Sequence, residues 1–164
     1  MDILLSTYCD MILSIKTGSR NGQQAISKPL LVYSIILAID VGHLKENKIQ
    51  YPDIVVQAIF GALYCRYYKI DDMKFLNSQY FIRPFFHLDG SDFYSLVWKE
   101  GVKFPSKSTT PSGKFLRENL LYAKLDDGLW GVLEVEENRE YIKEKIKERY
   151  FNELQIWQQN TMTS

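Results

Sequence analysis

The chain has 164 residues, of which 46% are hydrophobic and 14% aromatic, so it can build one domain around a hydrophobic core. No apolar run approaches the roughly 18 uncharged residues of a membrane-spanning helix. The first apolar stretch contains Asp2 and Asp10 without a basic leader, unlike a secretory signal. The net charge of zero, taken alone, argues against a strong phosphate-binding protein. We therefore expect a soluble, cytoplasmic protein.

The charges are unevenly distributed along the chain. Residues 1–117 carry 14 Lys and Arg against 10 Asp and Glu, whereas residues 118–164 carry 6 against 10. Within the first part, residues 99–117 contain five basic side chains and a single acidic one, Glu100. A neutral total can therefore hide a basic face that binds an anion, although a solvated loop of lysines fits the same counts.

Two helices are predicted in the first 42 residues. Residues 2–16 place apolar side chains at helical spacing, and a polar loop, 17–24, follows. The most apolar segment of the chain comes next. Ser27 can cap its free amides, Pro29 suits its first turn and Gly42 can provide a left-handed exit. We expect this second helix to be central and buried.

Lys28 occupies an unusual position at the start of this predicted helix. The helix dipole repels cations at its amino-terminal end, so a lysine there costs free energy. An anionic partner would offset that cost. We therefore treat Lys28 as a candidate anion-binding residue, with an ordinary surface lysine as the alternative.

A further helix is predicted from Asp53 onward, after a short strand around Ile49. It ends in a cluster of tyrosines mixed with Arg66 and Lys69. Basic residues among aromatic ones can stack on and pair with nucleic acid. A tyrosine-rich flank of the core is the simpler interpretation of the same spacing.

Residues 81–98 combine aromatic side chains with Arg83, Pro84 and His87 around an Asp-Gly turn at 89–92. Apolar residues alternate on both sides of this turn, which predicts a β-hairpin. A hairpin that served only the core would not need Arg83 and His87. We expect its apolar side chains to divide between the core and a ligand pocket, the core set being Phe85, Leu88, Phe93 and Trp98 and the pocket set Pro84 and Phe86.

The last third of the chain is predicted to contain a loop and three helices. Residues 101–114 lack apolar periodicity and carry three lysines as their only charges, which is typical of a binding loop on a rigid scaffold. A helix is predicted over 115–123, a short one is capped by Asp126, and Asn138 caps the last. Dense opposite charges at i,i+3 and i,i+4 mark that last helix as solvated on its outer face.

The search for catalytic motifs finds no paired-His spacing, CxxC, GxSxG or phosphate-loop pattern. Cys9 and Cys65 lie far apart on apolar helix faces, so we expect reduced, buried and inert thiols rather than a zinc site. His43 and His87 lie in different settings, and a Cys–His nucleophile pair is the remaining route to catalysis. We expect a protein that is not an enzyme and that needs no cofactor and no metal.

Four segments together resemble a known family. They are KPLL at 28–31, PFFHL at 84–88, SGKFLRENLLYAKLDDGLW at 112–130 and ENREYIKEKIKERYF at 137–151. In this order they resemble the sulfur-binding domain of phosphorothioate-DNA-dependent restriction endonucleases. The resemblance covers residues 1–151 and leaves 152–164 as the end of the last helix and a tail. The expected fold is α+β, a mainly helical single domain with a β-hairpin, winged-helix-like in arrangement.

In that family the domain recognises DNA whose backbone carries sulfur in place of one non-bridging phosphate oxygen, and an HNH nuclease domain usually follows. The resemblance therefore implies phosphorothioated double-stranded DNA as the partner, a role in bacterial restriction and defence, and a separate nuclease that acts with this chain. Many relatives carry a histidine at the position of Ser27, an aromatic residue at that of Arg83 and a tryptophan at that of Phe86. These departures bear on selectivity for sulfur rather than on the fold.

Physical chemistry supports a two-part site. Sulfur is larger, more polarizable and more weakly hydrated than a phosphate oxygen, so an apolar wall accepts it at lower cost. The predicted sulfur pocket consists of Arg83, Pro84, Phe86 and Leu116. Cations, hydroxyls and backbone amides can balance the negative charge of the phosphorothioate group, and one side chain can contact the edge of a base. The predicted DNA-binding residues are Lys28, Arg83, His87, Ser112, Gly113, Lys114 and Arg117.

Two alternative functions stay open at this stage. One is a winged-helix-like DNA or protein interaction module without sulfur selectivity, and the other is an enzyme with a cryptic site. The role of His87 is also open, because a packed or capped histidine in a strand would suit the same position.

Overall fold

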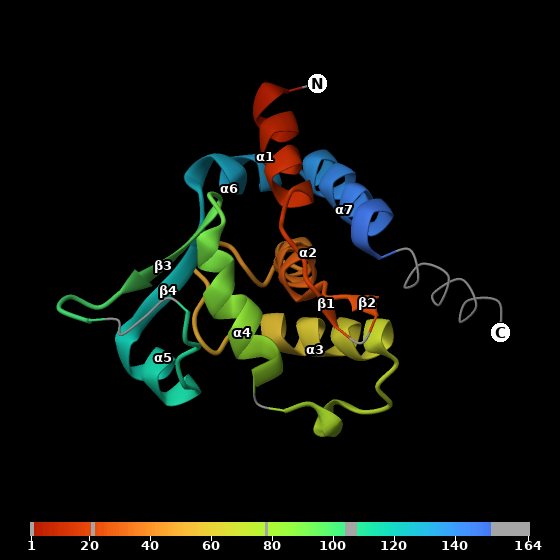
Figure 1. The fold of residues 1–164 in the computed structure, drawn as a ribbon. Coiled ribbons are helices and arrows are strands. Elements are labelled where there is room, and N and C mark those ends of the chain that lie inside the picture. Colours follow the sequence, from red (N-terminus) through yellow and green to blue (C-terminus); the bar gives the residue numbers. More distant parts are fainter. Residues whose placement is uncertain (1, 21, 78, 104–107, 152–164) are drawn as a thin grey trace.

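The computed structural model describes residues 2–20, 22–77, 79–103 and 108–151, which form an α+β fold around one hydrophobic core (Figure 1). The described residues contain seven α-helices and two antiparallel sheets of two strands each. In chain order the elements are α1 (Ile3–Leu13), β1 (Ser19–Arg20), β2 (Gln23–Gln24), α2 (Ser27–Asp40), α3 (Ile54–Tyr68), η1 (Met73–Phe75), α4 (Gln79–His87), η2 (Leu88–Gly90), β3 (Tyr94–Trp98), α5 (Gly113–Asn119), β4 (Leu120–Leu125), α6 (Asp127–Leu133) and α7 (Glu136–Tyr150). The predicted helix end and tail at 152–164 lie outside the described residues.

Helix α2 forms the centre of the core because apolar side chains surround its axis, as predicted. Residues 30–36 are all buried, and the helix contacts α3, α4 and α7. Figure 1 shows α2 nearly end-on, with α1 and α7 on one side and α3 and α4 on the other. Pro29 lies in the first turn and Gly42 leaves the helix with φ +78°, both as predicted. The cap position belongs to Ile26 rather than Ser27, because Ser27 already has helical backbone.

Helix α3 begins where the sequence predicts, because the Asp53 carboxylate accepts a hydrogen bond from the Val56 N–H at 2.9 Å. It ends at Lys69, whose backbone is left-handed with φ 56°. The strand predicted around Ile49 is reduced to a single bridge between Ile49 and Ala123. In the predicted polar loop 17–24, a short hairpin of β1 and β2 was missed.

The predicted β-hairpin around residues 89–92 is wrong. Its first half is helix α4, and its second half, β3, pairs with β4 from a distant part of the chain. Phe81, Ile82, Phe85 and Phe86 are buried, and this i, i+1, i+4, i+5 spacing has the period of a helix rather than of a strand. Aromatic residues have a high strand propensity, and this led to the prediction of a strand. The helical spacing of the buried residues decides the conformation, because it places them on one face that packs against the core.

The helix predicted over 115–123 is also only half correct. Helix α5 ends at Asn119, and the chain continues as β4, with Trp98 opposite Leu120 and Tyr94 opposite Leu125. Pairing with β3 satisfies the backbone groups of these residues while Leu120, Ala123 and Leu125 face the core.

Helices α6 and α7 begin without the side-chain caps that the sequence predicts. Asp126 does occupy the cap position of α6, but its carboxylate accepts a hydrogen bond from the Tyr8 hydroxyl instead of capping a backbone amide. The last helix begins at Glu136, so Asn138 does not cap it; the Asn138 side-chain amide donates to the Val132 carbonyl at 3.0 Å.

Candidate functional site

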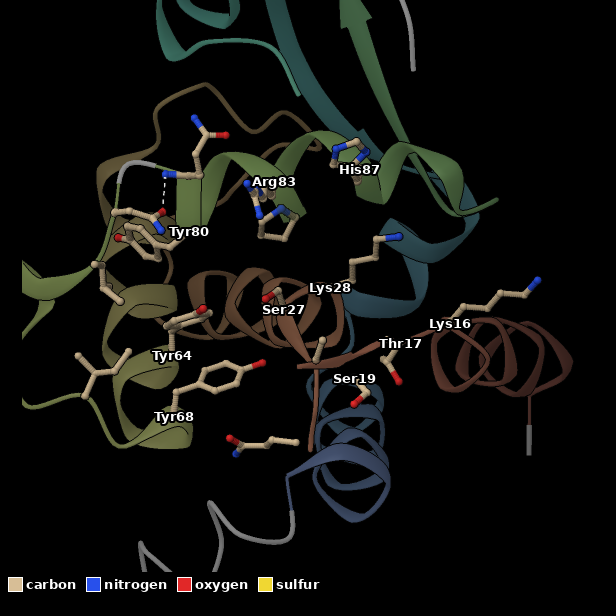
Figure 2. Close-up of a pocket in the computed structure, with 18 of the residues that line it drawn as sticks. Lys16, Thr17, Ser19, Ser27, Lys28, Tyr64, Tyr68, Tyr80, Arg83 and His87 are labelled. Carbon is tan, nitrogen blue, oxygen red and sulfur yellow. Dashed lines mark hydrogen bonds between the residues drawn. The ribbon is translucent and has the colours of Figure 1, made fainter. Parts of the chain in front are cut away.

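A cavity of about 820 Å³ opens between four parts of the fold (Figure 2). Its walls come from the end of α1 with the β1–β2 segment, the first turn of α2, the carboxyl-terminal half of α3 with the connection through η1, and α4. The lining residues are Lys16, Thr17, Gly18, Ser19, Gln23, Ala25, Ser27, Lys28, Tyr64, Tyr68, Ile70, Phe75, Leu76, Asn77, Gln79, Tyr80, Arg83, Pro84 and His87.

One side of the cavity is cationic. Lys16 follows α1, Lys28 projects from the first turn of α2, and Arg83 projects from α4 (Figure 2). Among the described lining residues there is no Asp or Glu. The salt bridges formed within the described part of the chain include none of these three cations. Lys16 extends outward from the cavity in Figure 2, so Lys28 and Arg83 are the two cations closer to its interior.

The first turn of α2 adds backbone donors to the same wall. Its cap residue, Ile26, has no side chain that can accept from the helix amides. Within the described residues, no backbone or side-chain acceptor is found for the N–H groups of Ser27 and Lys28. Free amides at the positive end of a helix are suited to an anion, and here they lie beside a lysine that the helix dipole destabilises.

His87 lies on the cationic side as a neutral hydrogen-bonding group. Its Nε2 is 2.8 Å from the Thr110 hydroxyl oxygen. Burial lowers the pKa of the imidazole below its ordinary value of 6.5, and the nearby charges of Lys28 and Arg83 lower it further. Lys28, Arg83 and His87 all line the same cavity.

The structure brings together half of the predicted sulfur pocket. Arg83 and Pro84 both line the cavity. Phe86 and Leu116 do not, because Phe86 is 5% exposed and packs edge-on against the His87 ring, and Leu116 is 0% exposed within the core. The apolar surface available beside Arg83 is therefore the proline ring and the methylene groups of the cationic side chains.

The predicted residues on α5 form a separate basic group. Ser112, Gly113, Lys114 and Arg117 are not among the residues that line the cavity. The Ser112 hydroxyl accepts from the Phe115 N–H at 3.1 Å and so caps α5. A methyl group added at Gly113 would lie 3.2 Å from the Tyr51 hydroxyl, so this glycine permits close packing. Lys114 and Arg117 are exposed.

The core expectations for residues 85–98 are mostly correct. Phe85, Leu88 and Phe93 are buried at 1%, 0% and 1% exposure, while Trp98 is only partly buried and packs against the edge of the core. Sequence reasoning missed Lys16, whose place at the cavity depends on how α1 meets α2. It also missed that Tyr64 and Tyr68 of α3 line this cavity, although it did single out the tyrosine cluster.

A second cavity of about 660 Å³ shares Lys16 and Lys28 with the first. Its other lining residues include two carboxylates, Asp10 and Asp92, which offset the charge of the lysines on that side. The cationic character is therefore stronger toward the first cavity, which we call the α2–α4 cavity.

The cysteines and His43, which lie outside the cavity, are buried in the core or contact a helix cap. Cys9 and Cys65 are free and buried, as predicted, and burial raises the pKa of both thiols, which disfavours the reactive thiolate. In the described part of the chain, no three His, Cys, Asp or Glu side chains come together in a way that could hold a metal ion. The His43 Nε2 lies at hydrogen-bond distance, 2.9 Å, from the carboxylate of Asp53, the cap residue of α3.

Comparison with known proteins adds no family to this description. The sequence matches no model of a known protein family, and a search of curated proteins gave no match. Within the described residues, none of the helices combines the length and hydrophobicity needed to cross a bilayer.

Proposed function

We propose that this chain is a non-catalytic DNA-binding module that holds one backbone phosphate group of double-stranded DNA, in its phosphorothioate form, in the α2–α4 cavity. The observation that carries the proposal is the meeting of Lys28, Arg83 and His87 in one cavity whose described lining has no carboxylate. Lys28 comes from the first turn of α2 and the other two from α4, so the fold gathers them from separate segments.

Each group has a distinct part in this binding. Lys28 and Arg83 supply positive charge, and the guanidinium of Arg83 can donate two parallel hydrogen bonds to a phosphate-type group. The free N–H groups at the start of α2 provide further donors. Backbone contacts of this kind position DNA without reading its sequence, and they make binding dependent on salt.

Selectivity for sulfur is the finer part of the proposal. Pro84 is largely buried in α4 but borders the cavity in the same wall as Arg83, so part of its apolar ring is available there. An oxygen anion placed against that ring would lose water without compensation, whereas a weakly hydrated, polarizable sulfur would lose less. This part is supported by the resemblance of the KPLL, PFFHL and later segments to sulfur-binding domains.

The biological setting follows from the same resemblance. We propose a cytoplasmic role in bacterial restriction or defence, in which a separate nuclease cleaves DNA that this module marks. A winged-helix-like arrangement belongs to this proposal: α4 would be the helix that approaches DNA, and the β3–β4 ribbon would be the wing.

The second candidate is a DNA or protein interaction module without sulfur selectivity. One specific observation favours it. Phe86 and Leu116 are buried away from the cavity, which leaves Pro84 as the apolar contact predicted from the family resemblance. If the proline ring alone does not distinguish sulfur from oxygen, Lys28 and Arg83 would bind an unmodified phosphate equally well.

A binding titration separates these candidates. One duplex is prepared with and without a single stereodefined sulfur, and its affinity for the protein is measured by fluorescence anisotropy at about 50 and 200 mM salt. We expect about tenfold tighter binding of one sulfur stereoisomer, which corresponds to about 1.4 kcal/mol. Equal affinity for modified and unmodified duplexes would leave the second candidate, and no binding to any duplex would reject both DNA-binding candidates.

A further inference from the structure

The α2–α4 cavity is larger than a single backbone group requires. Its volume of about 820 Å³ lies within the range of about 300–1,000 Å³ typical of pockets that enclose a whole small ligand. The cations occupy one part of it, so the remaining space is lined by other residues whose chemistry identifies what could fill it.

The opposite end of the cavity is aromatic. Tyr64 and Tyr68 on α3 have ring centroids 4.5 Å apart, and Tyr80 at the start of α4 lies 5.8 Å from Tyr64 (Figure 2). Phe75 on η1 lines the same end and is 66% exposed. The side-chain amides of Asn77 and Gln79 line the cavity beside this aromatic group.

Phe75 is unusual among the exposed apolar side chains. It combines exposure with a place in the wall of a cationic cavity, and the Lys74 ammonium lies 5.3 Å from its ring centroid. A solvent-facing aromatic ring next to a cation is the arrangement that single-stranded nucleic-acid binders use to stack a base while holding its phosphate.

We propose that the α2–α4 cavity accommodates one unpaired nucleotide of the bound DNA, with its phosphate at Lys28 and Arg83 and its base against Phe75 and Tyr80. This inference rests on the proposed function and deepens it, because it assigns a ligand to the half of the cavity that backbone binding leaves unused. Asn77 and Gln79 also line the cavity; the Asn77 side-chain oxygen accepts from the Gln79 N–H at 2.9 Å, and side-chain amides of this kind can hydrogen-bond the edge of a base.

The two ends of the cavity match a nucleotide in charge as well as in shape. A lipid chain would require a continuous apolar wall, but Thr17, Ser19 and Ser27 interrupt it with hydroxyls. A base within a duplex is stacked and paired, so it can reach the aromatic end only after leaving the helix, which costs a few kcal/mol. DNA in which that nucleotide is already unpaired avoids this cost.

The test compares three duplexes that all carry the same phosphorothioate. One is fully paired, one has a single unpaired nucleotide next to the sulfur, and one has an abasic residue at that place. We expect the unpaired nucleotide to tighten binding about tenfold over the paired duplex. The abasic duplex should lose most of this gain, because it retains flexibility but lacks the base that stacks.

Two variants locate the effect at the aromatic end. Phe75→Ala changes an exposed side chain and should remove most of the gain without affecting the melting temperature. Tyr80→Leu should act in the same direction, but Tyr80 packs against Phe60 and Phe81, so its fold is checked by circular dichroism. Ile54→Ala, at a residue that is 80% exposed and outside the cavity lining, serves as the matched control.

The outcomes distinguish this inference from the proposed function. Equal binding of paired and unpaired duplexes, with both weakened by Arg83→Ala, would overturn the nucleotide site and leave backbone binding intact. A gain that survives in Phe75→Ala and Tyr80→Leu would also overturn it, since the gain would then come from DNA flexibility alone. Failure to bind any duplex would overturn both proposals.

Discussion

Each end of helix α2 carries a charge that the helix dipole disfavours, but only one of the two charges is paired within the described residues. At its carboxyl end Asp40 lies where the helix dipole disfavours an anion, and it is paired with two cations of α7, Arg139 at 2.6 Å and Lys143. At its amino end Lys28 lies where the dipole disfavours a cation, and within the described residues it has no ion pair; it lines a cavity together with Arg83. Within the described residues the fold compensates the first charge by ion pairs and does not compensate the second, which our proposal assigns to DNA binding.

This difference suggests how to separate stability from binding. Asp40, Arg139 and Lys143 are only 19%, 14% and 12% exposed, so their pairing joins α2 to α7 in surroundings with little solvent screening. Lys28 and Arg83 contribute no such link between elements. Substitutions at one end of α2 should therefore change unfolding, and those at the other should change DNA affinity.

The largest expected effect is on stability at the carboxyl end. Asp40→Asn removes the carboxylate that Arg139 and Lys143 share, so the partly buried Arg139 loses its ion pair and Lys143 keeps only the exposed Glu140. We therefore expect a loss of about 3 kcal/mol in the free energy of unfolding. Urea denaturation measures it. Glu140→Gln is the matched control, since Glu140 also contacts Lys143 but is 62% exposed and should contribute less than about 1 kcal/mol. Equal effects of the two substitutions would show that the Asp40 pairing has no special role.

The same residue predicts the acid behaviour of the protein. Burial alone would raise the pKa of Asp40, but hydrogen bonds from Lys143 and Arg139 outweigh it and hold the pKa below its ordinary value of 3.8. A carboxyl whose pKa is lower in the folded than in the unfolded chain stabilises the fold at pH values above its unfolded-state pKa. This contribution is lost as the pH falls through the folded-state pKa. Asp40→Asn should lack that part of the acid dependence, and an unchanged pH profile would contradict the assignment.

The next effect is on binding at the amino end. Arg83→Ala should weaken binding of phosphorothioated duplex about tenfold, or about 1.4 kcal/mol, because it removes the charge-assisted hydrogen bonds to the backbone group. Its melting temperature should stay within a few degrees of the wild type, since Arg83 is exposed. Lys45→Ala, at an exposed lysine outside the cavity lining, is the control for general charge loss. If both variants lose affinity equally, the cavity is not the binding site.

A smaller effect is expected from His87 and pH. A bound phosphate group would offset the repulsion that Lys28 and Arg83 exert on the imidazolium, so the pKa of His87 should rise on binding. Binding then takes up protons, and affinity should increase by up to a few fold as the pH falls from about 7.5 to 6. His87→Gln should flatten this dependence in anisotropy titrations, whereas an unchanged slope would exclude His87 from the site.

The smallest effect is a gain in stability. Lys28→Met removes a cation from the positive end of α2 while keeping a similar side-chain volume, so the free energy of unfolding should rise by about 0.5 kcal/mol. DNA affinity should fall in the same variant. This opposite change in stability and binding is the signature of a charge kept for a ligand, and a loss of stability instead would place Lys28 in the structural framework.

Part of this molecule could be read directly from residues close together in sequence. The apolar run of α2, with Pro29 in its first turn and Gly42 after its end, and the Asp53 cap of α3 depend on local spacing, and both helices form where expected. Lys28, Arg83 and His87 could be selected as candidate residues because their charge or polarity was out of place in apolar segments, and Pro84 because it offers an apolar ring beside them; all four line the cavity.

Only the tertiary structure decided which of these residues meet. Residues 81–87 have aromatic composition typical of strands, yet they are helical because packing against α2 and α3 requires one buried face. Residues 120–125 follow a helix without a break, yet they form β4 because β3 supplies their hydrogen-bond partners. Strand pairing and cavity walls depend on contacts between distant segments. For that reason the sequence alone placed Phe86 and Leu116 in the pocket, and the folded chain buries them in the core and lines the cavity with Lys16 and the tyrosines instead.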